Sequence, residues 1–153
     1  MTDIDILLTL KEVLLGRSIS QIDKSQDFII HLNHYPIKKD GYPNLIMLTM
    51  LSDWYIKEIG DWADINNLFP LDTSTLSIPY EPMKAYYLHY LSENRKITEV
   101  IFDNISLEIK FGSDFTVVLP NKNQYDHLAW IVAGNEIQIS YNSEENKCYF
   151  DGI

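Results

Sequence analysis

Cysteine is almost absent from this sequence, which has only Cys148 among its 153 residues. A single cysteine cannot form an internal disulfide, so the disulfide framework of many small secreted proteins is excluded. The first residues are acidic, whereas a secretory signal needs a positively charged start followed by an apolar run. No stretch approaches the roughly 18 apolar residues of a membrane-spanning helix. These features predict a cytoplasmic protein.

Positive charge is also scarce. Twelve Lys and Arg residues stand against 22 Asp and Glu, which gives a net charge of −10 and an isoelectric point near 4.6. Such a surface repels phosphate backbones and anionic lipid headgroups, so direct binding to nucleic acid or membrane is disfavoured. Opposite electric fields steer association, so a basic protein partner is favoured. The competing interpretation is that the acidity only keeps the protein soluble.

The residue patterns that carry catalysis or bind metals are lacking as well. No serine lies in a G-x-S-x-G motif, and the six glycines are scattered rather than gathered in a phosphate-binding loop. His31 is expected on a strand and His34 at a turn, with no nearby Cys, Asp or Glu pair to complete a metal site. Asp126 and His127 are expected on a strand, where neighbours point to opposite faces. Cys148 is expected to be a small buried hydrophobe. We therefore predict no enzyme, no metal and no cofactor.

The sequence does contain the material for a globular fold. Hydrophobic residues make up 46% and charged residues 22%, and the length favours one domain over residues 1–153. Residues 2–15 predict a helix, because Thr2 and Asp5 suit an N-terminal capping box and Gly16 can end the helix in a left-handed conformation. Residues 82–93 predict a second helix from their apolar spacing.

The remaining periodic segments predict strands. They are residues 17–32 as a hairpin, 44–50, 54–59, 97–102, 106–111, 115–119, 128–132, 136–141 and 147–150. A faint internal repeat relates residues 17–59 to residues 95–150, with Trp54 and Trp130 at matching positions and both expected to be buried. The expected fold is α+β, an antiparallel sheet of two similar meander halves with an N-terminal helix and a middle helix.

The segment from residue 58 to residue 81 has no clean period and is acidic. It carries five Asp and Glu residues and neither Lys nor Arg, so it supplies half of the net charge of −10. Carboxylates around an aromatic side chain favour a hot spot for a basic partner. The predicted partner-binding residues are Glu58, Asp61, Trp62, Asp64 and Asp72. The competing interpretation is that Trp62 and Phe69 pack inward and anchor the loop.

One part of the chain resembles a known family. Residues 107–117, followed by Pro120, Tyr125 and Trp130, resemble a bacterial pattern L-x-x-x-F-x-[DG]-G-x-x-L-x-V … P … Y-[ED]-x-W, and residues 15–19 resemble that family's opening strand. The loop after Phe111 departs from the pattern, since Gly-Ser-Asp replaces Asp-Gly. Several members look like immunity proteins of contact-dependent growth inhibition and other polymorphic toxin systems. The resemblance implies a protein that occludes a cognate toxin, often a basic nuclease, without catalysis.

Two other functions stay open at this point. The ten tyrosines could line the pocket of a small-molecule-binding or regulatory domain, which a cavity of suitable size would indicate. An undetected enzyme would instead show polar groups with shifted pKa values converging in a cleft. The oligomeric state is not predicted.

Overall fold

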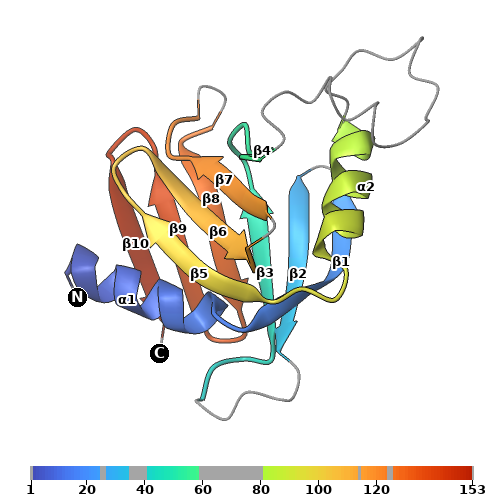
Figure 1. Ribbon diagram of the computed structural model, residues 1–153. Helices are drawn as coiled ribbons and strands as arrows, with labels where there is room; N and C mark the ends of the chain where they lie inside the picture. The colour runs from blue at the N-terminus through green and yellow to red at the C-terminus, as the bar shows by residue number, and fades with distance from the viewer. Residues whose placement is uncertain are drawn as a thin grey trace.

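The structure is a computed structural model that describes residues 2–24, 27–34, 41–58, 81–113, 115–123 and 126–152. This part of the chain forms two helices and ten strands (Figure 1). In chain order they are α1 (Asp3–Leu14), β1 (Arg17–Lys24), β2 (Phe28–His34), β3 (Leu45–Met50), β4 (Tyr55–Ile56), α2 (Glu81–Ser92), β5 (Ile97–Phe102), β6 (Ser106–Phe111), β7 (Phe115–Pro120), β8 (Leu128–Gly134), β9 (Ile137–Asn142) and β10 (Lys147–Gly152).

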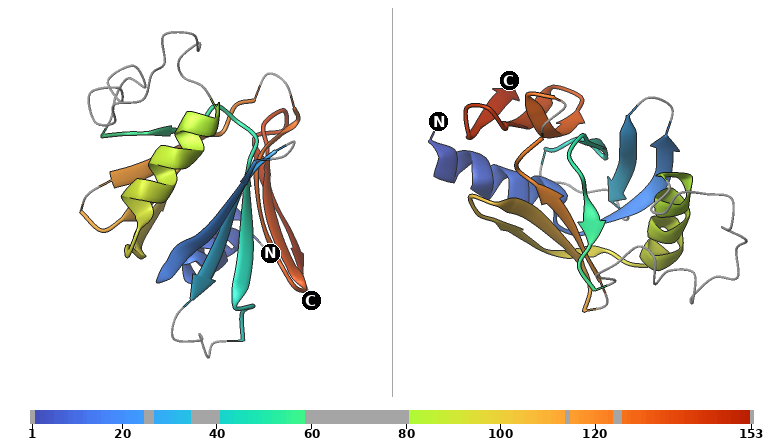
Figure 2. Two further views of the ribbon diagram at one scale, coloured as in Figure 1. Left: turned by 90° about the vertical axis from the view of Figure 1, so that its right-hand side faces the viewer. Right: turned by 90° about the horizontal axis from the view of Figure 1, so that it is seen from above.

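The strands form two sheets that face each other in two layers (Figure 2). One sheet has the order β1-β2-β3-β8-β9-β10 and the other β4-β7-β6-β5, and all the pairings are antiparallel. Apolar side chains from both sheets and both helices join in one buried core. Helix α1 contacts β5 and β10, whereas α2 contacts β1. The predicted α+β class is therefore confirmed.

The path of the chain between the sheets differs from the prediction. We expected β8, β9 and β10 to continue the sheet of β5, β6 and β7, and this is wrong because they lie in the six-stranded sheet. The alternation of apolar residues in a strand shows which side chains face the core. It does not show which of two sheets facing the same core the strand joins, so the sequence pattern cannot detect the crossing after β7.

Helix α1 begins and ends as its sequence predicts. The backbone N–H of Asp5 donates to Thr2 Oγ1 over 3.2 Å, and the N–H of Thr2 donates to Asp5 Oδ2 over 3.0 Å, which completes the capping box. Gly16 follows the helix with φ +82°, a conformation that favours glycine. A Cβ atom there would lie 2.8 Å from His34 Nε2, so a larger residue would also require the His34 side chain to shift.

The unit α1–β1–β2 and the unit α2–β5–β6 share several structural details. Helices α1 and α2 both have 12 residues, and each is followed two positions later by a residue with positive φ, Gly16 at 82° and Asn94 at 61°. The next residue is an arginine in each case. The guanidinium groups of Arg17 and Arg95 both donate to the backbone carbonyl four residues earlier in the chain. Both helix ends therefore have an arginine bonded to an otherwise open carbonyl.

The first strand after each helix has a break in register at a corresponding place. In the β1–β2 pair the shift lies between Ile19 and Gln21, and in the β5–β6 pair it lies between Ile97 and Glu99. Both shifts start two residues after the arginine. A bulge of this kind bends and twists its strand, so the two hairpins receive the same local distortion.

The fourth strand after each helix pairs with a strand of the other half of the chain. Strand β3 pairs with β8, with Met50 opposite Trp130, and β7 pairs with β4, with Tyr55 opposite Val118. The four-stranded sheet therefore takes β4 from the first half of the chain, and the six-stranded sheet takes β8, followed by β9 and β10, from the second half. Trp54, the residue before β4, is 2% exposed and Trp130 is 0% exposed. The predicted burial of both tryptophans is confirmed.

Arg17 is a fully buried charged residue. Besides Val13 at the end of α1, its guanidinium donates to the backbone carbonyls of Leu32 over 3.4 Å, Asn44 over 2.6 Å and Pro43 over 2.6 Å. These acceptors belong to α1, β2 and the connection before β3. Buried polar groups cost free energy when they lack hydrogen bonds, so this side chain satisfies several backbone groups at once and joins three segments.

Candidate binding surface

Of the predicted partner-binding residues, the structure describes Glu58. Its Oε2 atom accepts a hydrogen bond of 2.8 Å from the backbone N–H of Thr116, and the N–H of Lys57 donates to the Thr116 carbonyl over 3.0 Å. Glu58 thus holds the chain after β4 against β7, although its side chain is exposed. The other four, Asp61, Trp62, Asp64 and Asp72, lie outside the described residues.

The two histidines of the H-x-x-H pattern are not brought together. His31 and His34 both belong to β2, and His34 pairs with Arg17, so the expectation of His34 at a turn is wrong. Residues three apart on a strand point to opposite faces of the sheet. Across the described ranges, no group of three or more His, Cys, Asp and Glu side chains could hold a metal ion.

Asp126 and His127 differ from the prediction. They precede β8 instead of lying on a strand, and His127 Nδ1 lies 3.2 Å from Asp126 Oδ1. The same Oδ1 atom accepts the backbone N–H of Leu128 over 3.1 Å, which is the turn geometry that aspartate favours. Because the local backbone turns here, neighbouring side chains can meet. Both side chains are exposed.

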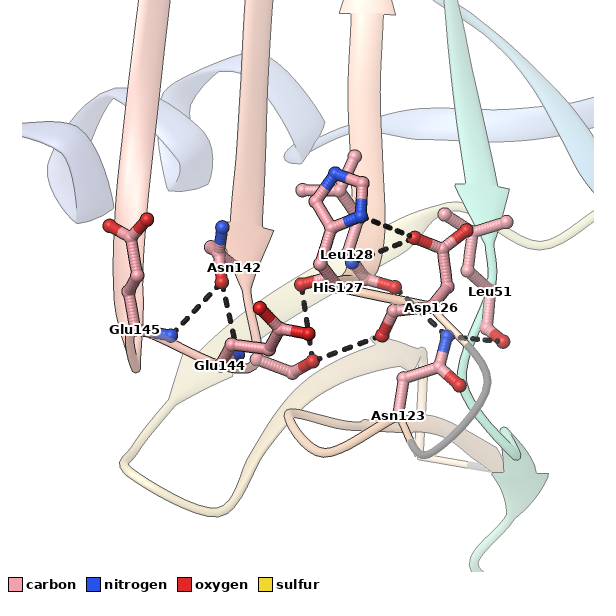
Figure 3. Close-up of polar contacts among 9 residues, drawn as sticks. Leu51, Asn123, Asp126, His127, Leu128, Asn142, Glu144 and Glu145 are labelled. Atoms are coloured by element: carbon pink, nitrogen blue, oxygen red, sulfur yellow. Dashed lines mark hydrogen bonds and ion pairs between the residues drawn. The ribbon is translucent and has the colours of Figure 1, made fainter.

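Four chain connections meet at one end of the two sheets, and Figure 3 shows part of this region. Asn123 Nδ2 donates to the carbonyls of Leu51 over 3.0 Å and Leu128 over 2.9 Å. The N–H of Ser143 donates to the carbonyl of His127 over 2.7 Å. These bonds join the connection after β3, the connection before β8 and the turn between β9 and β10.

Asn121 joins the fourth connection to the same region. Its N–H donates to the carbonyl of Ile105 over 2.8 Å, and its buried side chain donates to the Asp103 carbonyl over 2.9 Å while accepting from Trp130 Nε1 over 3.3 Å. The turn between β5 and β6 is thereby fixed to the core. We call this surface, made of residues 51–54, 103–105, 121–123, 126–127 and 143–146, the acidic loop end.

The charge of the acidic loop end is strongly negative. Its exposed carboxylates are those of Asp53, Asp103, Asp126, Glu144 and Glu145. Lys122 is the one lysine or arginine within these residues, so five negative charges and one positive charge leave −4. On the four-stranded sheet, by contrast, Glu108 lies 3.1 Å from Lys57 and Glu99 lies 3.6 Å from Lys110. The loop end therefore has an excess of carboxylates over cations, whereas these two carboxylates of the four-stranded sheet each lie beside a lysine.

The turn between β9 and β10 presents its carboxylates from an ordered backbone. Asn142 Oδ1 accepts the N–H groups of both Glu144 and Glu145 over 3.0 Å, as Figure 3 shows. The hydroxyl of Tyr149 donates to Glu145 Oε2, and this hydrogen bond raises the pKa of Tyr149. The Lys147 ammonium lies 5.4 Å from the centre of the Tyr149 ring. These contacts hold the two glutamates at the tip of the hairpin.

The turn between β5 and β6 is ordered in a similar way. Asp103 Oδ1 accepts the backbone N–H groups of Ile105 over 2.7 Å and Ser106 over 2.9 Å. These bonds favour the ionised carboxylate, and they lower the pKa of Asp103. Two turns of the acidic loop end thus use a side-chain oxygen to bind consecutive backbone N–H groups.

The sequence pattern places Glu144 and Glu145 in the turn between the strands predicted over residues 136–141 and 147–150. It does not bring Asp53, Asp103 and Asp126 to the same place. A usable signal was present, because the turns of an antiparallel meander alternate between two ends of a sheet. The turns after β5, β7 and β9 must therefore share one end, and each contains Asp, Asn or Glu residues.

Two other groups that could carry chemistry lie in the core. Cys148 is 3% exposed, and burial raises the pKa of its thiol to about 12, so the expected buried cysteine is confirmed. Tyr141 is buried with its ring centre 5.7 Å from that of Phe102 and 6.0 Å from that of Trp130. This tyrosine therefore contributes to packing.

Comparison of the chain with protein-family models, with curated proteins and with solved structures gives no match. Neither described helix has the length and apolar character needed to cross a membrane.

Proposed function

We propose that the chain is an immunity protein that binds a cognate, basic bacterial toxin domain in the cytoplasm and neutralises it by occlusion, without catalysis. The observation that supports this proposal is the acidic loop end, where five exposed carboxylates lie on ordered turns. Complementary charge accelerates encounter with a basic partner and selects against acidic ones.

The ordered turns bear on the strength of such binding. Lysine and arginine side chains of the toxin would donate charge-assisted hydrogen bonds to the carboxylates. Binding usually costs free energy for ordering loops and side chains at an interface. Asn142 and Asp103 already fix these two turns in the free protein. The cost of ordering is therefore reduced for Glu144 and Glu145 in one turn and for Asp103 in the other.

The predicted acidic segment fits the same proposal. Asp61, Trp62, Asp64 and Asp72 would supply further contacts, with Trp62 as the apolar centre. Glu58 begins this segment, and its bond to Thr116 connects it with β7. Strand β4 is only two residues long, so Glu58 follows closely after Asp53 of the acidic loop end. We include the segment in the proposed contact surface for this reason.

The proposal also includes the internal repeat of residues 17–59 and 95–150. Equal helix lengths, a positive-φ residue before each arginine and register shifts at corresponding positions support two related halves. The reciprocal pairing of β4 with β7 and of β8 with β3 supports it further. If both halves share one backbone arrangement, the residues that differ between them become candidates for a role in function.

The first experiment is capture from a lysate of the native cells with the purified chain as bait, followed by mass spectrometry. The proposal expects one basic partner at a stoichiometric ratio. Recovery of an acidic partner, or of a small molecule without a protein, contradicts it.

Binding kinetics of variants that remove charges or the tryptophan then locate the contact. Glu144→Gln and the pair Asp61→Asn/Asp64→Asn should slow association and flatten its dependence on salt, while Trp62→Ala should mainly speed dissociation. Glu136→Gln is the matched control, because Glu136 is exposed in the turn between β8 and β9, at the opposite end of these strands. Equal effects of Glu144→Gln and Glu136→Gln would show that only net charge matters.

A further inference from the structure

Helix α1 has two apolar sides. The inner side, formed by Ile6, Leu10, Val13 and Leu14, is buried in the core. On the outer side Ile4 is 70% exposed, Leu8 55% and Leu15 37%. Positions 4, 8, 11 and 15 are spaced by four, three and four residues, so they lie in one line along the helix. Lys11 is the fourth member of this line.

The core does not need the apolar residues on the outer side of α1. A helix on the surface of a globular protein is typically apolar on one stripe and polar on the other side. Single exposed hydrophobic residues are common, whereas several in one patch indicate a binding surface. The residue that directly follows α2 is Glu93, exposed, where Leu15 directly follows α1. We call Ile4, Leu8 and Leu15 the outer ridge.

The outer ridge has an acidic border. Asp5 and Glu12 are seven residues apart and therefore lie along the same side of α1, next to the ridge. The Tyr42 hydroxyl donates to Glu12 Oε2 over 2.9 Å, and Asp5 belongs to the capping box, so both carboxylates have defined positions. With Asp3, the helix carries three carboxylates and the single cation of Lys11.

This charge pattern selects among three kinds of occupant. Helices that lie on a membrane surface carry Lys and Arg beside the apolar face, and α1 carries mainly carboxylates there. A second copy of this chain would bring another −10 charge against the ridge. A partner with an apolar face bordered by Lys or Arg satisfies both the ridge and its border.

We propose that the outer ridge of α1 is a docking surface for a basic amphipathic helix of a partner protein. Ile4 and Leu8 enter the partner's apolar face, and Asp5 and Glu12 bind its cationic margin. This inference does not rest on neutralisation of a toxin, and the ridge is built of different residues from the acidic loop end.

The test uses a defined probe, a peptide of about 14 leucine and lysine residues arranged as an amphipathic helix. A scrambled peptide of the same composition is its control, because it has the same charge without the apolar face. Methyl NMR of the full chain should show shifts at Ile4, Leu8 and Leu15 with the first peptide and much weaker shifts with the second. Removal of apolar side chains from water is the main source of binding free energy at a surface of this kind.

The double variant Ile4→Gln/Leu8→Gln should therefore weaken binding of the amphipathic peptide at least about tenfold. Leu45→Gln is the matched control, since Leu45 is 44% exposed at the start of β3, outside both the ridge and the acidic loop end, and it should bind like the wild type. Equal shifts with both peptides, shifts elsewhere than the ridge, or unchanged affinity of the double variant overturn the proposal. Self-association through the ridge in sedimentation, or binding to anionic vesicles that the double variant abolishes, also overturns it.

Discussion

The unit α1–β1–β2 and the unit α2–β5–β6 have the same sequence of parts but different side chains at the helix ends. Arg17 is fully buried and donates to four backbone carbonyls, whereas Arg95 is partly exposed and donates to Leu91 over 2.6 Å. Gly16 lies against His34, and Asn94 has the same kind of backbone conformation. The same backbone geometry therefore accepts different residues at the two helix ends. The contacts around each position determine which residue fits there.

The largest expected effect tests whether the two tryptophans play matching parts. Trp54→Ala and Trp130→Ala should each destabilise the fold by roughly 3–5 kcal/mol, because each removes a large buried side chain. Urea unfolding followed by circular dichroism measures the change. If either variant unfolds at the wild-type midpoint, the correspondence between the two strands fails at that position.

Unlike the two tryptophans, the two arginines should contribute different amounts to the free energy of unfolding. Arg17→Ala removes a fully buried donor from two buried and two partly buried backbone carbonyls and should cost about 3 kcal/mol or more. Arg95→Ala removes an arginine that is partly exposed and should cost about 1 kcal/mol. The free energies of unfolding of the two variants give the comparison directly. Equal losses would contradict the central position of Arg17.

Substitutions at the two residues with positive φ should change the free energy of unfolding by different amounts. Gly16→Ala should cost about 1–2 kcal/mol, because the added Cβ meets His34 at 2.8 Å and the left-handed conformation disfavours alanine. Asn94→Gly should be neutral or slightly stabilising, within about 0.5 kcal/mol, because glycine adopts this conformation freely. Thermal unfolding of both variants is the measurement, and a stable Gly16→Ala variant would show that His34 moves away.

The smallest expected effect concerns the start of α1. The side-chain and backbone hydrogen bonds with Thr2 hold the pKa of Asp5 below the ordinary value of an aspartate. A lowered folded-state pKa contributes stability that is present above the unfolded pKa and is lost as pH falls through the folded value. Carboxyl NMR titration should give a midpoint for Asp5 below the ordinary aspartate value, and this midpoint should shift upward in Thr2→Ala. A midpoint at or above the unfolded value would rule out the capping box in solution.

The sequence predicted features that depend on local chemistry. The capping box of Thr2 and Asp5, the left-handed Gly16 and the hairpin of β1 and β2 follow from neighbouring residues. The helix over residues 82–93 was predicted within one residue of α2 at each end, since its apolar spacing is regular.

The remaining features depend on contacts between distant residues. Strand β4 has only two residues, and its pairing with β7 depends on bonds from Lys57 and Glu58 to Thr116. The acidic loop end combines connections that are far apart in sequence, so no single segment contains its pattern. The four hydrogen bonds of Arg17 likewise reach residues up to 27 positions away. Local periodicity carries no information about such partners.

The proposal that the chain neutralises a basic toxin is tested most directly by growth of cells that produce the captured basic partner. Co-production of the wild-type chain should restore growth, and a variant with Asp126→Asn, Glu144→Gln and Glu145→Gln should restore it less well at equal protein levels. The proposal is contradicted if the partner does not arrest growth, or if growth stays arrested while the folded wild-type chain is present in excess.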